Sequence, residues 1–207
     1  MKKFIVLTVI SLAFLGQAMA QDKIPASRQE EGRTVFAVKT NLLYDLGTVL
    51  NYSLELPLGN HFSLAWENYC AWWAFGNRAS IEYLTLGGEA RWWIAPRKGR
   101  LTGHFLGAYG FWGRTDLQVG TLGGYQVPTM WSAGLRYGYS FRLSKGWHLE
   151  LSLAGGFLRA DYQHYTPAAD WSVLWRDPEN TGILSFWGPT NVSVTLVKTF
   201  RITPKAK

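Results

Sequence analysis

Eight charged residues occupy positions that would point to one side of extended strands, where they could pair with one another. The set consists of four acids, Glu55, Glu67, Glu89 and Glu150, and four bases, Lys39, Arg91, Arg136 and Arg142. Because acids and bases are equal in number, the set favours interlocking ion pairs, whereas an ion-conducting path would favour a ring of one sign. We predict that these side chains fill the interior of a barrel and fix the register of its strands.

Histidines are the other residues that could carry out chemistry. His61, His104 and His148 begin three non-adjacent segments, and their spacing matches no common pattern of metal ligands. His164 has neighbours of the kind that a lipid-modifying enzyme needs, which are the acids Asp161 and Asp170 and the hydroxyl residues Ser172 and Ser185. A single loop histidine is a weak basis for catalysis, so we expect no catalytic residue, no metal and no cofactor.

β-Strands would have to position these side chains, and the segment 131–143, WSAGLRYGYSFRL, has the clearest strand pattern. Large residues such as Leu135 and Phe141 alternate with small or charged ones such as Ser132 and Arg136. Since strand side chains alternate between two faces, one face is apolar and aromatic and the other is polar. Strands of suitable length are predicted at 35–44, 48–57, 61–75, 81–95, 101–114, 129–143, 147–161 and 189–202.

The connections between these segments indicate their topology. Tight turns at 58–60, 96–99 and 144–146 alternate with longer connections, of which 116–128 and 162–188 are the longest. The pattern predicts an all-β fold, an eight-stranded up-and-down antiparallel transmembrane β-barrel with its tight turns on the periplasmic side. A soluble barrel of the lipocalin type is the alternative, but its exterior should be dense in charge, and the polar face of 131–143 is mostly Ser and Gly.

Aromatic residues concentrate near both ends of the predicted strands, as expected for two membrane interfaces. Those near the turns are Phe62, Trp92, Phe141, Trp147 and Phe200. Those near the longer connections are Trp72, Trp112, Trp131, Phe157 and Trp187.

The N-terminal segment predicts export. A basic start, a short apolar run and the Ala18-Met19-Ala20 site predict a cleaved signal peptide at 1–20. A flexible periplasmic leader would follow at 21–33, and the barrel domain at 34–207. The expected location is the outer membrane, with both termini in the periplasm.

Composition restricts the partners. The formal charge of +7 is spread along the chain without a large Lys or Arg cluster, so we expect no nucleic acid, but lipid and lipopolysaccharide remain plausible partners of a basic barrel. The only cysteine, Cys70, excludes an internal disulfide. We expect a monomer.

The connection at 162–188 is the predicted place for recognition, because long aromatic loops are commonly functional. Its candidate contact residues are Tyr162, Tyr165, Trp171 and Trp175. An envelope protein or an extracellular ligand could bind there. Alternatively, 168–176 could form a short amphipathic helix at the membrane rim.

Several segments resemble a Bacteroidota family of small outer-membrane β-barrels that is classed as a domain of unknown function. They are KTNLLYDLG at 39–47, GGEARWW at 87–93, GHFLGAYG at 103–110, AGLRYGYSFRLSKGWHLELSLAGG at 133–156 and FWGPTNVSVTLV at 186–197. The resemblance implies an outer-membrane barrel and supplies no reaction or catalytic residue.

We therefore expect a structural or interaction protein of the cell envelope with a side-chain-filled lumen. The alternative is a channel for small hydrophobic molecules, which would require a lateral opening or a less filled lumen. A lipid A-modifying enzyme is a third alternative.

Overall fold

The computed structural model describes residues 33–74, 79–96, 101–119, 123–144, 146–168 and 174–202. The predicted signal peptide lies outside these residues, as does the predicted leader except for Arg33. The described elements are β1 (Arg33–Asn41), α2 (Leu42–Leu46), β2 (Leu50–Leu58), β3 (Phe62–Ala74), β4 (Ala79–Trp93), β5 (Gly103–Val119), β6 (Gly124–Ser144), β7 (Trp147–Pro167) and β8 (Leu174–Ile202).

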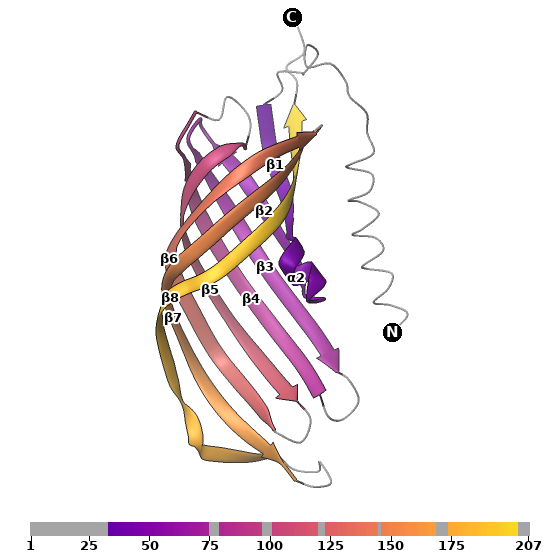
Figure 1. Cartoon of the computed structure of the whole chain (residues 1–207), viewed down its shortest axis with the longest axis vertical. Coiled ribbons are helices and arrows are strands. Elements are labelled where there is room, and N and C mark those ends of the chain that lie inside the picture. The colour runs from indigo at the N-terminus through magenta and orange to yellow at the C-terminus, as the bar shows by residue number, and fades with distance from the viewer. Residues whose placement is uncertain are drawn as a thin grey trace, which may run out of the picture.

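The eight strands form one closed antiparallel barrel (Figure 1). Each strand pairs with the next along the chain, and β1 closes the ring by pairing with β8, for example through Lys39 and Val197. The predicted all-β, eight-stranded, up-and-down antiparallel barrel is confirmed. Among the described residues, no helix is long and apolar enough to cross a membrane.

The polar face of most strands points into the barrel, whereas the buried residues of β5 include Phe105 and Tyr109. On β6, Ser132, Arg136 and Ser140 are buried, whereas Leu135 between them is 70% exposed. The same alternation runs along β2, where Glu55 is fully buried and its neighbours are exposed. This arrangement is the reverse of a soluble barrel, whose apolar side chains point inward.

An apolar cluster closes the lumen at the end where the tight turns lie. It consists of Ala37, Trp93, Leu101, Phe105 and Val197. The rings of Trp93 and Phe105 lie 5.2 Å apart, and a Cβ atom on Gly138 would overlap the Phe105 ring. Glycine at 138 therefore makes room for an aromatic ring inside a narrow barrel.

The strands differ greatly in length, so the rim of the barrel that is farthest from the tight turns slopes. β1 and β2 have 9 residues each, whereas β7 has 21 and β8 has 29. The longest strands extend well beyond the rest of the barrel in Figure 1.

Most residues of the two predicted long connections belong to these extended strands. β5 and β6 remain paired as far as Gln118 and Gly124, and β7 and β8 as far as Pro167 and Leu174. The prediction of loops at 116–128 and 162–188 was wrong because β-bulges interrupt the alternation. Register shifts occur between Gln126 and Thr129 and between Tyr162 and His164 on these strands, and each changes the phase of the polar pattern.

Candidate functional site

Seven of the eight charged residues predicted for the lumen form one network of ion pairs. They are Lys39 on β1, Glu55 on β2, Glu67 on β3, Glu89 and Arg91 on β4, Arg136 on β6 and Glu150 on β7. We call this set the lumen network. It joins six of the eight strands through side chains, so a shift of any one of these six strands would separate charges that are buried together.

Arg91 lies at the centre of the lumen network and contacts all four acids. Its Nη1 lies 2.8 Å from Glu150 and 3.2 Å from Glu55, its Nε lies 3.0 Å from Glu89, and its Nη2 lies 3.7 Å from Glu67. The side chain is 1% exposed. Its guanidinium also lies 4.4 Å from the centre of the Phe105 ring, so it connects the charges to the apolar cluster below.

Two further cations complete the lumen network on either side of Arg91. Lys39 pairs with Glu55 and Glu150, whereas Arg136 Nη1 pairs with Glu67 at 2.6 Å and with Glu89 at 2.7 Å. Each of the four carboxylates of the network therefore contacts two cations.

The barrel wall fits closely around these charges. Ser63 donates a hydrogen bond to Glu55, and a Cβ atom on Gly107 would collide with the Glu89 carboxylate. The space left beside Lys39, Arg91 and the other charges is about 10 Å³, which is at the lower limit for one water molecule. The lumen is thus filled at this level.

Arg142 is the eighth residue of the predicted set, and the structure does not bring it into the lumen network. It lies on β6 opposite His148, nearer the turn, and no ion pair joins it to another residue in the described ranges. Glu150 pairs across the strands with Ser140 instead, and its carboxylate turns toward Arg91. The network therefore holds four acids and three bases, in contrast to the predicted balance.

A hydrogen-bonded turn connects β1 to β2 and supports α2. The side chain of Asn41 accepts from the N–H of Leu43 at 3.1 Å, which caps the helix. The side chain of Asn51 accepts from the N–H of Asn41 at 2.6 Å and donates to Asp45 at 2.8 Å. Thr40 also donates to Asp45, at 2.8 Å.

This turn corrects the prediction of a first strand at 35–44, because β1 ends at Asn41. The local signal was present in the sequence: Asn41 is a good helix cap, and Gly47 follows the helix. A helix of five residues is too short to produce a clear hydrophobic period.

α2 places Tyr44 inside the barrel above the lumen network. Its ring lies 4.5 Å from that of Tyr69 and 6.4 Å from that of Tyr83. With Tyr109 and Arg136, these rings line a cavity of about 60 Å³, which we call the tyrosine chamber. This chamber is too small for a ligand while Tyr44 lies in it.

The wall beside α2 is interrupted because β1 and β2 are short. β1 pairs with β8 only as far as Thr195, and β2 pairs with β3 only as far as Cys70. α2 lies in this part of the wall (Figure 1), and its Leu46 is 80% exposed. Asn191 on the uncovered side of β8 donates to the Tyr44 hydroxyl at 3.5 Å.

Three of the four predicted contact residues of the outer connection, Tyr162, Tyr165 and Trp175, lie on the extended strands β7 and β8. Tyr162 packs near Tyr125, and Tyr165 donates to Gln163 at 2.7 Å. Trp175 is 65% exposed on β8. Trp171 lies outside the described residues, as does most of the predicted helix at 168–176, and the segment from Leu174 onward is strand.

His164 pairs with Asp177 and not with Asp161, one of the two acids that the sequence suggested. The other, Asp170, lies outside the described residues. Its Nδ1 lies 3.3 Å from Asp177, whereas Asp161 lies near Arg159. Hydrogen bonds from the Asn180 side chain and from backbone N–H groups hold the pKa of Asp177 below its usual value. In the described ranges no hydroxyl group is hydrogen-bonded to His164, and no group of three His, Cys, Asp or Glu residues could hold a metal.

A family model described as "Protein of unknown function (DUF3575)" matches residues 5–200. The chain belongs to this family. No curated protein and no solved structure gives a significant match.

The DUF3575 match includes the segments on which the resemblance rested, and the structure gives several of their residues a role. In KTNLLYDLG, Lys39 enters the lumen network, Asn41 caps α2 and Tyr44 fills the tyrosine chamber. In FWGPTNVSVTLV, Pro189 lies on β8 where β1 is no longer paired with it, and Thr190 bonds to Tyr109. Proline is tolerated in a strand at such an edge position, and Pro189 lies beside a register shift between β7 and β8.

Proposed function

We propose that this protein is an integral barrel of the outer membrane and acts as a structural or interaction protein of the cell envelope. The observation that supports this most strongly is the outward apolar surface. Large apolar side chains are exposed on every strand, including Val38, Leu54, Leu64, Leu86, Leu106, Leu135, Leu153 and Val192. A soluble monomer rarely exposes so extensive an apolar surface, whereas a lipid-facing barrel requires one.

Aromatic side chains lie at both edges of this apolar surface, as two membrane interfaces would require. On the side of the long strands, the Phe157 ring lies 5.2 Å from Trp131 and 5.0 Å from Trp187. On the turn side, Phe36 stacks on Phe200 at 4.5 Å. On β6, the residues between Trp131 and Phe141 correspond to the 9–11 residues of a tilted membrane strand.

The filled lumen favours a role at the outer end of the barrel over transport through it. The lumen network and the apolar cluster lie one below the other, and Arg91 contacts both. A monomer of this kind would contact outer-membrane lipid and lipopolysaccharide with its wall, and a protein or extracellular ligand with its extended strands.

Conductance in planar lipid bilayers tests the closed lumen. Purified protein, refolded and checked for heat-modifiable mobility on gels, should give no steady single-channel conductance, because side chains occupy the lumen. The variant Arg142→Ser should also give no single-channel conductance, since Arg142 lies outside the lumen network. Reproducible single-channel steps from the folded wild-type protein would contradict the proposal.

The interrupted wall beside α2 favours a second function, a channel for small hydrophobic molecules. Leu43 and Leu46 of α2 are exposed there, and the tyrosine chamber lies directly inside. A through-path would also have to cross the lumen network and the apolar cluster, so we rank this function second. A lipid A-modifying activity ranks third, because His164 lacks a hydrogen-bonded nucleophile within the described ranges.

A further inference from the structure

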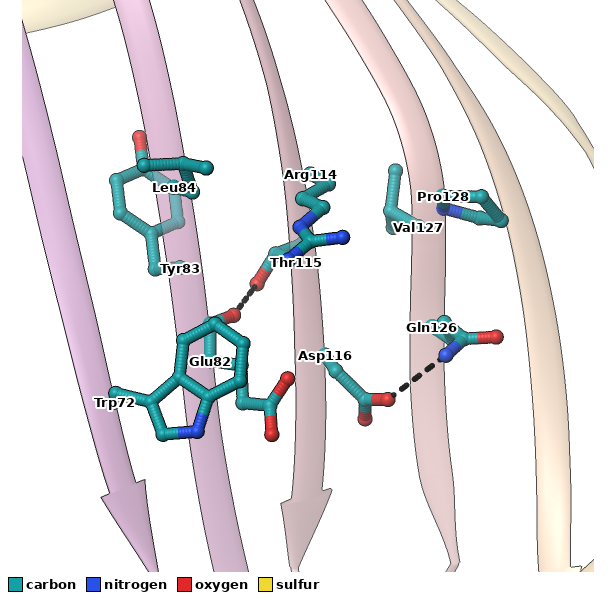
Figure 2. A pocket seen from close by; sticks show the side chains of 10 residues that line it. All are labelled: Trp72, Glu82, Tyr83, Leu84, Arg114, Thr115, Asp116, Gln126, Val127 and Pro128. Atoms are coloured by element: carbon teal, nitrogen blue, oxygen red, sulfur yellow. Dashed lines mark hydrogen bonds between the residues drawn. The ribbon is translucent and has the colours of Figure 1, made fainter.

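A pocket of about 410 Å³ lies on the barrel wall formed by β3 to β6, toward the ends of these strands that are farthest from the tight turns (Figure 2). We call it the wall pocket. Its lining includes Trp72, Glu82, Leu84, Arg114, Asp116 and Gln126. This volume is within the range of sites that bind small molecules, and it is much larger than the tyrosine chamber.

Strand register aligns the polar residues of the wall pocket in one row. Trp72 pairs with Glu82, Glu82 with Asp116, and Asp116 with Gln126. Directly paired residues of an antiparallel sheet point to the same face. Trp72 is 57% exposed and its neighbour Ala71 is buried, so this row lies on the outer face. Tyr83 also lines the wall pocket, and it lines the tyrosine chamber on the inner face as well.

The side chains of this row present a flat ring beside several hydrogen-bonding groups, as Figure 2 shows. Arg114 lies 5.9 Å from the centre of the Trp72 ring, and Gln126 donates to Asp116 at 3.1 Å. Glu82 and Arg114 form no ion pair with any residue of the described ranges, although they line the same pocket. The Glu82 carboxylate is therefore available to a ligand, and the Arg114 guanidinium is held only by its position over the Trp72 ring.

This combination of groups fits a sugar ring. The face of an indole packs on the C–H groups of a pyranose, carboxylates accept hydrogen bonds from its hydroxyl groups, and a guanidinium donates to its oxygens. Two acids and one base make an isolated phosphate a poor ligand, because Glu82 and Asp116 would repel it. A saccharide with many hydroxyl groups avoids this repulsion.

The position of the wall pocket along the barrel indicates where the sugar comes from, provided that the proposed membrane location holds. Phe62 is the first residue of β3, on the turn side of the barrel. The distance along β3 from Phe62 to Trp72 is about the length of a tilted membrane strand. Asp116 lies farther along β5, beyond Trp112. The pocket would then lie just outside the outer membrane surface, at the level of the glycolipid headgroups.

We propose that the wall pocket binds the core sugars of a lipopolysaccharide of the outer leaflet, with Trp72 as the stacking platform and Glu82, Asp116 and Arg114 as hydrogen-bonding partners. Recognition of this kind would attach the glycolipid layer to one side of the barrel.

Binding of purified lipopolysaccharide to the folded full chain in detergent tests this proposal, with calorimetry as the readout. Lipopolysaccharide that carries its core oligosaccharide should bind, and Trp72→Ala should weaken binding about tenfold or more through loss of the stacking surface. Trp66→Ala removes another outward tryptophan of β3 outside the pocket and should leave affinity unchanged. Heat-modifiable mobility on gels checks that each variant folds, and Glu82→Gln with Asp116→Asn serves as a second, conservative variant that should also weaken binding.

Two further probes separate the possible sources of binding. Lipid A, whose only sugars are its own phosphorylated glucosamine disaccharide, should bind as weakly to the wild type as whole lipopolysaccharide binds to Trp72→Ala, because Glu82 and Asp116 repel its phosphates. Equal binding of both to the wild type would overturn a site for the core sugars. Free core oligosaccharide should bind, but more weakly than the membrane-anchored form. If the free oligosaccharide binds with full affinity and the protein fails to insert into lipid vesicles, the sugar site stands and the membrane proposal fails.

Discussion

Replacing Arg91 with methionine is expected to lower the free energy of unfolding by about 3–5 kcal/mol. Arg91 is the cation shared by all four acids of the lumen network, and it is almost completely buried. Methionine replaces the aliphatic part of the side chain but carries no guanidinium, so Glu55 and Glu150 would share Lys39 alone, and Glu67 and Glu89 would share Arg136 alone. Removal of one partner from buried pairs is costly because the remaining charges stay out of water.

Urea unfolding of the protein in lipid vesicles, followed by heat-modifiable gel mobility, measures this loss. Arg142→Met is the matched control, because it makes the same chemical change on the inner face of the barrel outside the lumen network; we expect a loss below about 0.5 kcal/mol. Adding Glu150→Gln to Arg91→Met should recover part of the loss by removing one uncompensated acid. Equal losses for Arg91→Met and Arg142→Met would show that the network does not hold the barrel together.

Replacing Leu135 with arginine is expected to lower the free energy of unfolding in vesicles by about 2–4 kcal/mol. Leu135 points outward from β6, between Trp131 and Phe141, so under the proposed function it faces the hydrocarbon. On a barrel surrounded by water, the same change would replace an exposed apolar side chain with a charged one and would cost little. The two environments thus predict clearly different results.

Ile183→Arg provides the control for this effect. Ile183 is also exposed, but it lies on β8 beyond Trp187, farther from the middle of the barrel. We expect its substitution to change the unfolding free energy by less than about 1 kcal/mol, as for a position near or beyond the interface. A similar small change for Leu135→Arg would contradict a lipid-facing wall.

The sequence predicted the barrel and most of its interior because strand alternation has a period of two. Ser132, Arg136 and Ser140 could be assigned to one face of β6 without knowledge of any partner strand. The same reasoning identified all seven members of the lumen network. It could not exclude Arg142, because alternation gives the face of a residue but not its height relative to residues of other strands, which depends on barrel shear.

Local irregularity explains the other differences. α2 depends on the side chains of Asn41 and Asn51, which themselves lie in β1 and β2, so their strand pattern gives no signal of a helix. The extended ends of β5 to β8 contain bulges, and these change the phase of the alternation on which strand prediction relies. Tyr162 and Tyr165 therefore occur in paired strands and not in a loop.

The wall pocket was not predicted because its residues are far apart in the sequence. Trp72 was assigned only to an aromatic belt, and Glu82, Arg114 and Asp116 match no motif. Only the register of four strands brings Trp72, Glu82, Asp116 and Gln126 into one row.

The most direct test of the membrane location compares spin labels at residues 135 and 183. Leu135→Cys and Ile183→Cys are made in a Cys70→Ala background, since Cys70 is exposed on the outer face. The folded proteins in lipid vesicles are then exposed to oxygen, which concentrates in hydrocarbon, and to a water-soluble nickel chelate. The label at residue 135 should collide with oxygen and hardly with the chelate, and the label at 183 should show the reverse. Equal access of the chelate to both labels would contradict a membrane-spanning barrel.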